Sequence, residues 1–400
     1  MSPSAPAALL ARTQEIDPPA DLLDDLGPDG FAWLDGTGGL VTSGVAVRVA
    51  PADVARSLAA MTIEDPLARP GTGAIAVGAL PFAGTGELVV PQTVTAMAAD
   101  GTAWHTQIGS ADPAEPDGRD RSRPSVFAVE SVQSREDWHR MVEAVLGAIE
   151  EGRLLKAVLA REVTVEADAP FDPRAVLDRL RATQAGSVAY GFLDGPRTLV
   201  GATPELLVRR QGTLVLSRPM AGTMARRSSS AEDDRVATAL AASAKDDNEH
   251  RLVVDAVLDT LTPWCDDLRA DFPPDVVRLP ALMHLATAVR GRLREPAPTA
   301  LELAAALHPT PAVGGTPRVE ALPLIKRIEG FERGRYAGPV GWVDARGDGT
   351  WGVALRGAEM EGHRARLVSG AGIVAGSDPD AEWRETEVKL EPMLRVLVRP

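Results

Sequence analysis

The sequence predicts an α+β fold with largely antiparallel sheets. Strand-like segments come in runs joined by short turns, and Asp194-Gly195 and Gln211-Gly212 are typical hairpin turns within one such run. Helical patterns stand between these runs and do not alternate regularly with single strands, which argues against a doubly wound parallel sheet. A chain of 400 residues, 44% of them apolar, can bury a large core, and mixed folds of this size can be one unit.

The first elements along the chain are short. Residues 1–125 are rich in Ala, Gly, Pro and Asp and contain strand-like pieces such as 74–77. The polar stretch 112–124 is typical of a surface linker.

The patterns become clearer after this stretch. Ser134 can cap a helix whose apolar residues recur at helical spacing until Gly152. A strand is expected at 154–165, where Lys156 shares a face with Val158 and Ala160. Further along we expect strands within 187–223, helices at 231–261 and 301–307, strands at 337–344, 351–358 and 366–369, and a last helix at 380–396.

Composition narrows the class of protein. The formal net charge of −14 disfavours binding to nucleic acid or to anionic membrane surfaces. No apolar run approaches the length of a membrane-spanning helix, and residues 1–13 lack the basic start of a secretory signal. The single cysteine, Cys265, allows no internal disulfide. We therefore expect a cytoplasmic protein.

Two pairs of carboxylates stand on predicted helices. Asp246 and Glu249 are three residues apart, as are Glu382 and Glu385, so each pair lies on one helical face. If the two faces meet, four carboxylates form an oxygen-only site of the kind that suits Mg²⁺. The spacing alone favours the other interpretation, two solvated faces with Lys389 in a surface ion pair with Glu385.

Three further residues combine ionisable groups with apolar surroundings. Lys156 either extends its ammonium group to water or sits in a dry site, where a lowered pKa suits a base. Glu205 starts an apolar strand, and His284 lies among apolar residues, which is typical of a hydrogen-bonded core histidine.

Glycine-bearing loops at 221–223, 313–316 and 369–372 lack the spacing of nucleotide-binding loops.

Taken in order, seven stretches resemble the chorismate-utilising enzymes, over about residues 125–400. They are 201–206 (GATPEL), 219–223 (PMAGT), 245–250 (KDDNEH), 284–287 (HLAT), 307–315 (LHPTPAVGG), 336–342 (YAGPVGW), and the run from 370–374 (GAGIV) to 382–386 (EWRET). The resemblance implies one large unit of two stacked antiparallel sheets with flanking helices and a site between them. Residues 1–124 would be a scaffold part of this fold, and 125–400 the chorismate-binding catalytic region.

The resemblance also implies roles for individual residues. Glu249 and Glu385 would bind Mg²⁺, with Asp246 and Glu382 as outer or water-mediated partners. Arg356 and Tyr336 would hold the enolpyruvyl carboxylate of chorismate. The full set of implied substrate-binding residues is Thr223, His284, Thr287, Ala312, Val313, Tyr336, Arg356, Gly370, Gly372 and Lys389.

Two positions separate the branches of the family. The branches that add ammonia have Gln where this chain has Lys156, and the aminodeoxychorismate branch often has a nucleophilic Lys where this chain has Ala221. Both positions resemble the branches that add water. The resemblance thus implies an isomerase that makes isochorismate, with Lys156 as the base that activates water and Glu205 as the acid that protonates the leaving hydroxyl.

Three alternatives remain open at this point. A salicylate synthase would eliminate pyruvate from isochorismate in the same pocket. An ammonia-using synthase would bind a glutaminase partner, which Lys156 and Ala221 disfavour. A silent binding protein would lack turnover. We expect a monomer that needs no glutaminase, with a product that serves menaquinone, a catechol siderophore or salicylate.

Overall fold

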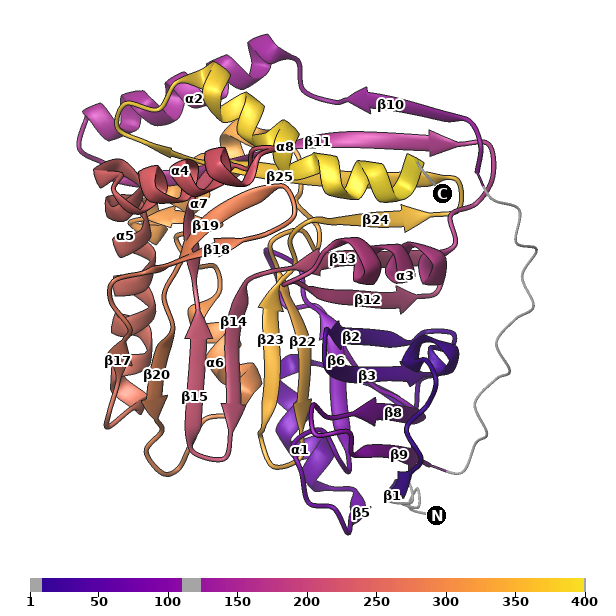
Figure 1. The fold of residues 1–400 in the computed structure, drawn as a ribbon. Helices are drawn as coiled ribbons and strands as arrows, with labels where there is room; N and C mark the ends of the chain where they lie inside the picture. Colours follow the sequence, from indigo (N-terminus) through magenta and orange to yellow (C-terminus); the bar gives the residue numbers. More distant parts are fainter. Residues whose placement is uncertain (1–8, 110–123, 399–400) are drawn as a thin grey trace, which may run out of the picture.

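The computed structural model describes residues 9–109 and 124–398 and contains two large sheets flanked by helices (Figure 1). The larger sheet has 13 strands, the second has nine, and a small third sheet has three. Within the described residues, strand pairs are antiparallel except for β1 (Leu10–Ile16) with β5 (Thr62–Glu64). The prediction of an α+β fold with mainly antiparallel sheets is confirmed.

The larger sheet joins both halves of the chain. Its strands, in order of pairing, are β10 (Phe127–Ser131), β11 (Lys156–Ala167), β25 (Arg364–Val374), β24 (Gly357–Glu361), β13 (Arg197–Thr203), β12 (Val188–Asp194), β2 (Phe31–Asp35), β3 (Gly38–Ser43), β8 (Thr93–Met97), β9 (Ala103–Ile108), β1 and β5, with β21 (Gly315–Thr316) beside β11.

The strands of the second sheet run at a steep angle to the strands of the first (Figure 1). Its order is β17 (Arg269–Ala270), β20 (Val289–Arg292), β15 (Leu214–Arg218), β14 (Leu206–Gln211), β23 (Gly349–Val353), β22 (Pro339–Asp344), β6 (Ile75–Ala79), β7 (Leu88–Val90) and β4 (Val47–Val49). The third sheet is β16 (Met220–Ala225), β19 (Leu282–Ala286) and β18 (Asp275–Arg278).

Helices cover the sheets. They are α1 (Val54–Ala59), α2 (Arg135–Glu150), α3 (Pro173–Thr183), α4 (Ser230–Ala241), α5 (Ala244–Leu261), α6 (Ala300–Leu307), α7 (Arg318–Glu329) and α8 (Pro379–Val398). Apolar side chains of α3 and α8 pack on the larger sheet, and those of α1, α5 and α6 pack on the second. Aromatic side chains such as Trp33 and Trp342 fill the space between the two sheets. The core is therefore layered, with helices outside and sheets inside.

Local signals explain where the elements begin and end. Ser134 caps α2 as expected, because its side chain accepts the N–H of Asp137 and the Asp137 carboxylate accepts the N–H of Ser134. The prediction of a single helix over 231–261 is wrong. The segment is divided into α4 and α5, because Ser243 has an extended backbone and caps α5.

The strand expected at 351–358 is also divided. Arg356 has a φ of 52°, a left-handed conformation that does not continue a strand, so β23 ends before it and β24 begins after it. The strand expected at 366–369 is longer and forms β25. Three helices, α1, α3 and α7, carried no expectation from the sequence.

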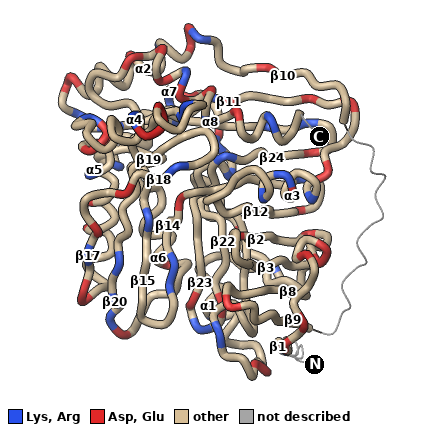
Figure 2. Tube along the Cα trace, viewed as in Figure 1, with Lys and Arg blue, Asp and Glu red and all other residues tan. Residues whose placement is uncertain are grey.

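Both charge signs are interspersed over the helices and sheets (Figure 2). Within 9–109 and 124–398, no helix is long and apolar enough to cross a membrane. Residues 112–123 of the expected linker lie outside the described residues. The boundary expected at residue 124 stays a prediction, and strands from both sides of it take part in each large sheet.

Candidate active site

A pocket with about 710 Å³ of empty space, part of it open to solvent, opens among β11, β25, α5, α8 and the third sheet. Most of the predicted site residues line it: Lys156, Glu205, Thr223, Glu249, His284, Ala312, Val313, Tyr336, Arg356, Gly370, Gly372, Glu385 and Lys389. Segments more than 200 residues apart in the chain thus meet at one place.

Three predicted residues do not line this pocket. Thr287 is buried, and its hydroxyl is 2.7 Å from Nε2 of His250. Asp246 accepts a hydrogen bond from the hydroxyl of Ser243, the residue that caps α5. Glu382 is buried and accepts a hydrogen bond from Ser377 at 2.8 Å. The structure therefore does not bring these three side chains into the lining of the pocket.

Lys156 points from β11 into the pocket. Its side chain is 1% exposed, and its Nζ lies 2.8 Å from Oε1 of Glu249 on α5. Burial raises the pKa of Glu249, but the attraction of the Lys156 ammonium group outweighs burial and lowers that pKa overall. Lys156 therefore does not reach bulk water. Its placement matches the second alternative of the sequence analysis, a lysine in a dry site.

Gly372 makes room for this ion pair. A Cβ atom at Gly372 would lie 2.7 Å from Oε1 of Glu249 and 2.9 Å from Cε of Lys156. Such approaches are shorter than real Cβ contacts, so any larger residue here would displace the pair. Gly372 thus leaves space in an extended strand for the ends of these two side chains.

Glu205 sits between the end of β13 and the start of β14 and is 4% exposed. Burial raises the pKa of its carboxyl group to about 7, although the positive charge of Lys156 and the N–H of Met220 oppose this rise. A carboxyl group with this pKa is protonated in a large fraction of molecules near neutral pH. Glu205 can therefore donate a proton inside the pocket.

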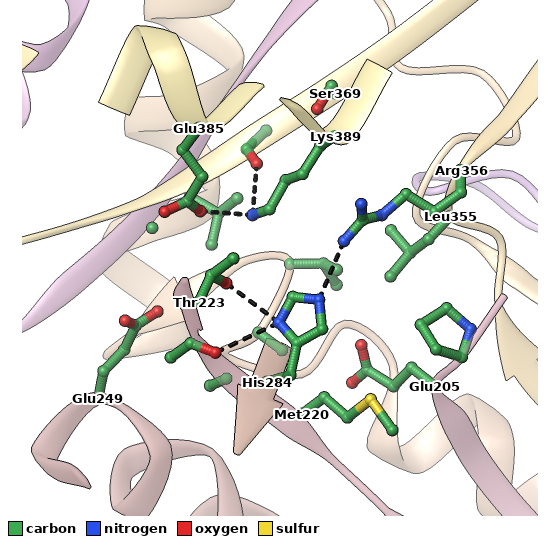
Figure 3. Close-up of a pocket in the computed structure, with 18 of the residues that line it drawn as sticks. Glu205, Met220, Thr223, Glu249, His284, Leu355, Arg356, Ser369, Glu385 and Lys389 are labelled. Carbon is green, nitrogen blue, oxygen red and sulfur yellow. Dashed lines mark hydrogen bonds and ion pairs between the residues drawn. The ribbon is translucent and has the colours of Figure 1, made fainter. Parts of the chain in front are cut away.

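His284 stands between the two ends of the pocket (Figure 3). Burial and the positive charges of Arg356 and Lys389 hold its pKa well below 6.5, so the ring is neutral. Nη2 of Arg356 donates to Nε2 at 3.1 Å, and Nδ1 lies 3.2 Å from the carbonyl oxygen of Gly222. Since a guanidinium can only donate, this network assigns the ring proton to Nδ1.

Arg356 and Tyr336 form the cationic end of the pocket. Burial lowers the pKa of Arg356 to about 10 and raises that of Tyr336 to about 12, so the first stays charged and the second stays protonated at neutral pH. The left-handed backbone of Arg356 directs its guanidinium to His284. This end can receive a carboxylate.

The opposite end is acidic. In Figure 3, Glu249 and Glu385 lie on one side of His284, and Glu205 and Arg356 lie on the other. Nζ of Lys389 donates to Oε1 of Glu385 at 2.6 Å and to the carbonyl of Gly370 at 3.0 Å.

Two of the carboxylates near this end have raised pKa values. Burial and the nearby charge of Glu385 raise the pKa of Glu382 to about 7, and burial together with Glu249 raises the pKa of Asp246. No group of three or more His, Cys, Asp or Glu in the described parts is arranged to hold a metal ion. Carboxylate oxygens are nevertheless the donors that a hard divalent cation prefers.

Several residues that line the pocket carried no prediction. Pro204, Met220, Leu355 and Val368 contribute to its wall, as does Val158 on the strand face already noted for Lys156. Apolar wall residues give no distinctive signal in one sequence. Only Val158 and Val368 could have been predicted. Each is two residues from a predicted site residue in the same strand, so it shares that residue's face.

A buried lysine, a glutamate with a raised pKa and a cationic end, gathered in one pocket, define an acid–base enzyme for a small anionic substrate. The chorismate binding enzyme family model matches residues 54–398. The chain belongs to the chorismate binding enzyme family.

Named relatives have similar sequences and folds. A putative isochorismate synthase, MenF, of Mycobacterium tuberculosis is 40% identical over 380 residues, 92% of this chain and 95% of that protein. A putative 2,3-dihydroxybenzoate-specific isochorismate synthase of Bacillus anthracis superposes with a TM-score of 0.81 at 34% identity, covering 94% of this chain and 98% of that one. The menaquinone-specific isochorismate synthase MenF of Escherichia coli gives 0.84 at 26% identity, over 100% and 97%.

Proposed function

We propose that this protein is an isochorismate synthase, an isomerase that moves a hydroxyl group of chorismate from C4 to C2 of the ring. The observation that carries the proposal is the placement of Lys156 and Glu205 in one buried pocket, the first beside the acidic end and the second beside Arg356. The relatives named above support it, because their names specify this activity.

The polarity of the pocket suggests how chorismate binds. Its enolpyruvyl carboxylate would meet Arg356 and the hydroxyl of Tyr336, and its ring carboxylate would face Lys389 at the opposite end. β24 pairs with β25 only as far as Leu367, so the edge of β25 at Gly370 and Gly372 faces the pocket. Backbone N–H groups on this edge would face the carboxylate as well.

The two proton carriers then act on different atoms of the ring. Lys156, as the free amine, takes a proton from water while the oxygen of that water bonds to C2. The ring double bonds shift, the C4–O bond breaks, and Glu205 gives its proton to the departing oxygen, so that water leaves. One water enters and one leaves, which makes the net change an isomerisation. Lys156 is then an ammonium and Glu205 a carboxylate, and one proton returns before the next cycle.

We propose Mg²⁺ as the cation, held by Glu249 and Glu385 with Asp246 and Glu382 as outer partners. Bound there, it would supply positive charge for the ring carboxylate and withdraw electron density from the ring. Lys156 cannot accept a proton while its ammonium group is paired with Glu249 as in this structure. A glutamate committed to a cation would be a weaker partner for that ammonium group.

The test is chorismate turnover by the purified chain with Mg²⁺ and without ammonia or any other protein. Chromatography should show isochorismate formed as chorismate disappears. Salicylate and pyruvate formed at the same rate would establish a salicylate synthase instead. Anthranilate formed with added ammonium would contradict the water-using assignment, and the lack of any turnover would overturn the proposed function.

We further propose that the enzyme acts in the cytoplasm as a monomer without a glutaminase. The support is that Lys156, Glu205 and Arg356 line one pocket of a single chain. Light scattering of the active protein should give a mass near 42.1 kDa. A larger particle would contradict the monomer.

A further inference from the structure

The strand that carries Lys156 has a gap in its pairing. On the edge of β11 away from β25, β21 pairs with Lys156 and Ala157, and β10 pairs with residues 163–167. Among the described strands, none pairs with residues 158–162 on this edge. Buried backbone groups in such a gap need other hydrogen-bond partners, or the strand is destabilised there.

A buried ion pair fills the middle of the gap, between the bond from the N–H of Val158 to Gly314 and the bonds of Glu162 with Val132 and Gln133. Nη2 of Arg333 donates to the carbonyl of Val158 at 2.8 Å, and the N–H of Ala160 donates to Oε1 of Glu329 at 2.8 Å. The carbonyl of one strand residue and the N–H two residues later point to the same edge. The guanidinium and the carboxylate thus supply the donor and the acceptor that a neighbouring strand would supply.

The same pair reaches two other walls of the pocket. Nε and Nη2 of Arg333 donate to the two oxygens of Glu329 at 2.9 and 2.5 Å, and both side chains are 2% exposed. Nη1 donates to the carbonyl of Val313 at 2.7 Å, and the guanidinium lies 5.9 Å from the ring centre of Tyr336. Val313 and Tyr336 both line the pocket, whereas Arg333 and Glu329 do not.

We propose that Arg333 and Glu329 are positioning residues. They hold Lys156, Val313 and Tyr336 in the positions that catalysis requires. The role in catalysis rests on the proposed function, and the contacts themselves do not. The pair acts through the backbone of β11, two and four residues beyond Lys156. A displacement of about 1 Å in a catalytic group can cost on the order of 10²-fold in rate, so loosening this edge should lower turnover.

The test variant removes both charges together, as Glu329→Leu with Arg333→Met. Removing one alone would leave an unpaired buried charge and endanger folding. The matched control is Arg395→Met, which breaks an exposed pair with Glu391 at the same spacing of four residues, away from the pocket. A second variant, Arg333→Lys, keeps the charge but loses the planar fork that reaches Glu329, Val158 and Val313 together.

Two measurements are made on each folded variant: kcat and KM for chorismate, and amide hydrogen exchange of a peptide covering 156–161. We expect the double variant to lose about 10- to 100-fold in kcat with KM changed less than about threefold, because Arg356 still holds the substrate. Exchange should rise in this peptide and stay unchanged in α3. Arg333→Lys should fall between wild type and the double variant, and Arg395→Met should match wild type.

A kcat within twofold of wild type in the folded double variant, or in Arg333→Lys should the double variant fail to fold, would overturn the proposal. Faster exchange throughout the chain, with kcat lost only in proportion to the unfolded fraction, would also overturn it. A wild-type protein that converts no chorismate would refute the proposed function, but not the positioning of β11 by this pair. The local exchange of 156–161 would still decide whether the pair positions β11.

Discussion

Gly372 and Glu249 lie so close that a Cβ atom on the first would come within 2.7 Å of Oε1 of the second. Gly372→Ala should therefore displace the Lys156–Glu249 pair and lower kcat, while the protein stays folded because only side-chain ends must move. Gly147→Ala is the control, since nothing lies within 4 Å of a Cβ there and alanine stabilises a helix by about 0.5–1 kcal/mol. Steady-state rates and thermal melts of both variants check this. Full activity in Gly372→Ala would contradict a functional role for the spacing.

The pH dependence of kcat/KM should report Glu205. Its pKa, raised to about 7 by burial, means that the acid form is lost as pH increases through 7. Lys156 contributes its own pH dependence to both proteins, so the ratio of the wild-type rate to the slower Glu205→Gln rate should fall on the alkaline side with a midpoint near 7. Profiles from pH 5.5 to 9 decide the point. The same alkaline limb in Glu205→Gln would assign the acid to another group.

The affinity for Mg²⁺ should depend on Glu385 and not on Glu391, which lies on the same helix, α8. Loss of even an outer partner of a metal ligand costs about 10–100-fold in affinity, so Glu385→Gln should weaken Mg²⁺ binding at least that much. Glu391→Gln, half-exposed on the same helix, should leave it unchanged. Calorimetric titration with Mg²⁺ alone measures this, and EDTA should stop turnover by the wild type until Mg²⁺ is restored. Equal affinities in both variants would refute the proposed ligand.

Stability should depend on pH through His308. Its Nε2 donates to the carbonyl of Phe82 at 3.0 Å, and burial lowers its pKa to about 4. The unfolded chain binds a proton below about pH 6.5 and the folded chain does not, so stability is present above 6.5 and lost as pH falls.

His308 should contribute about 1–2 kcal/mol to the difference in the free energy of unfolding between pH 7 and pH 5. His308→Gln should lose this part of the pH dependence, and His363→Gln, at an exposed position, should keep it. Urea unfolding at both pH values measures the difference. Identical pH dependence in wild type and His308→Gln would show that the ring is protonated in the fold.

Local patterns predicted much of the fold, because caps and periodicity act over a few residues. Ser134 and the apolar spacing after it correctly placed α2. The division between α4 and α5 depends on Ser243, a cap inside a region whose periodicity looks continuous. α7 begins after Pro317 and contains Pro323, a composition that hides a helix.

The pocket was predicted through resemblance rather than through spacing. Lys156 and Glu249 are 93 residues apart in the chain, so no local pattern relates them, and only the fold brings them within 2.8 Å. Arg333 contacts the backbone carbonyls of Val158, 175 residues away, and of Val313, 20 residues away. Such contacts leave no mark on the residue types of the partners.

The central claim is that Lys156 activates the water that adds to chorismate. The direct measurement is isochorismate formation by Lys156→Gln and Lys156→Ala at several pH values, with chorismate affinity measured alongside. We predict a loss on the order of 10²- to 10⁴-fold in turnover, the usual contribution of a positioned base. Affinity should change much less, since Arg356 and the acidic end with its cation remain. Wild-type rates in both variants would contradict the account and assign water activation to another group.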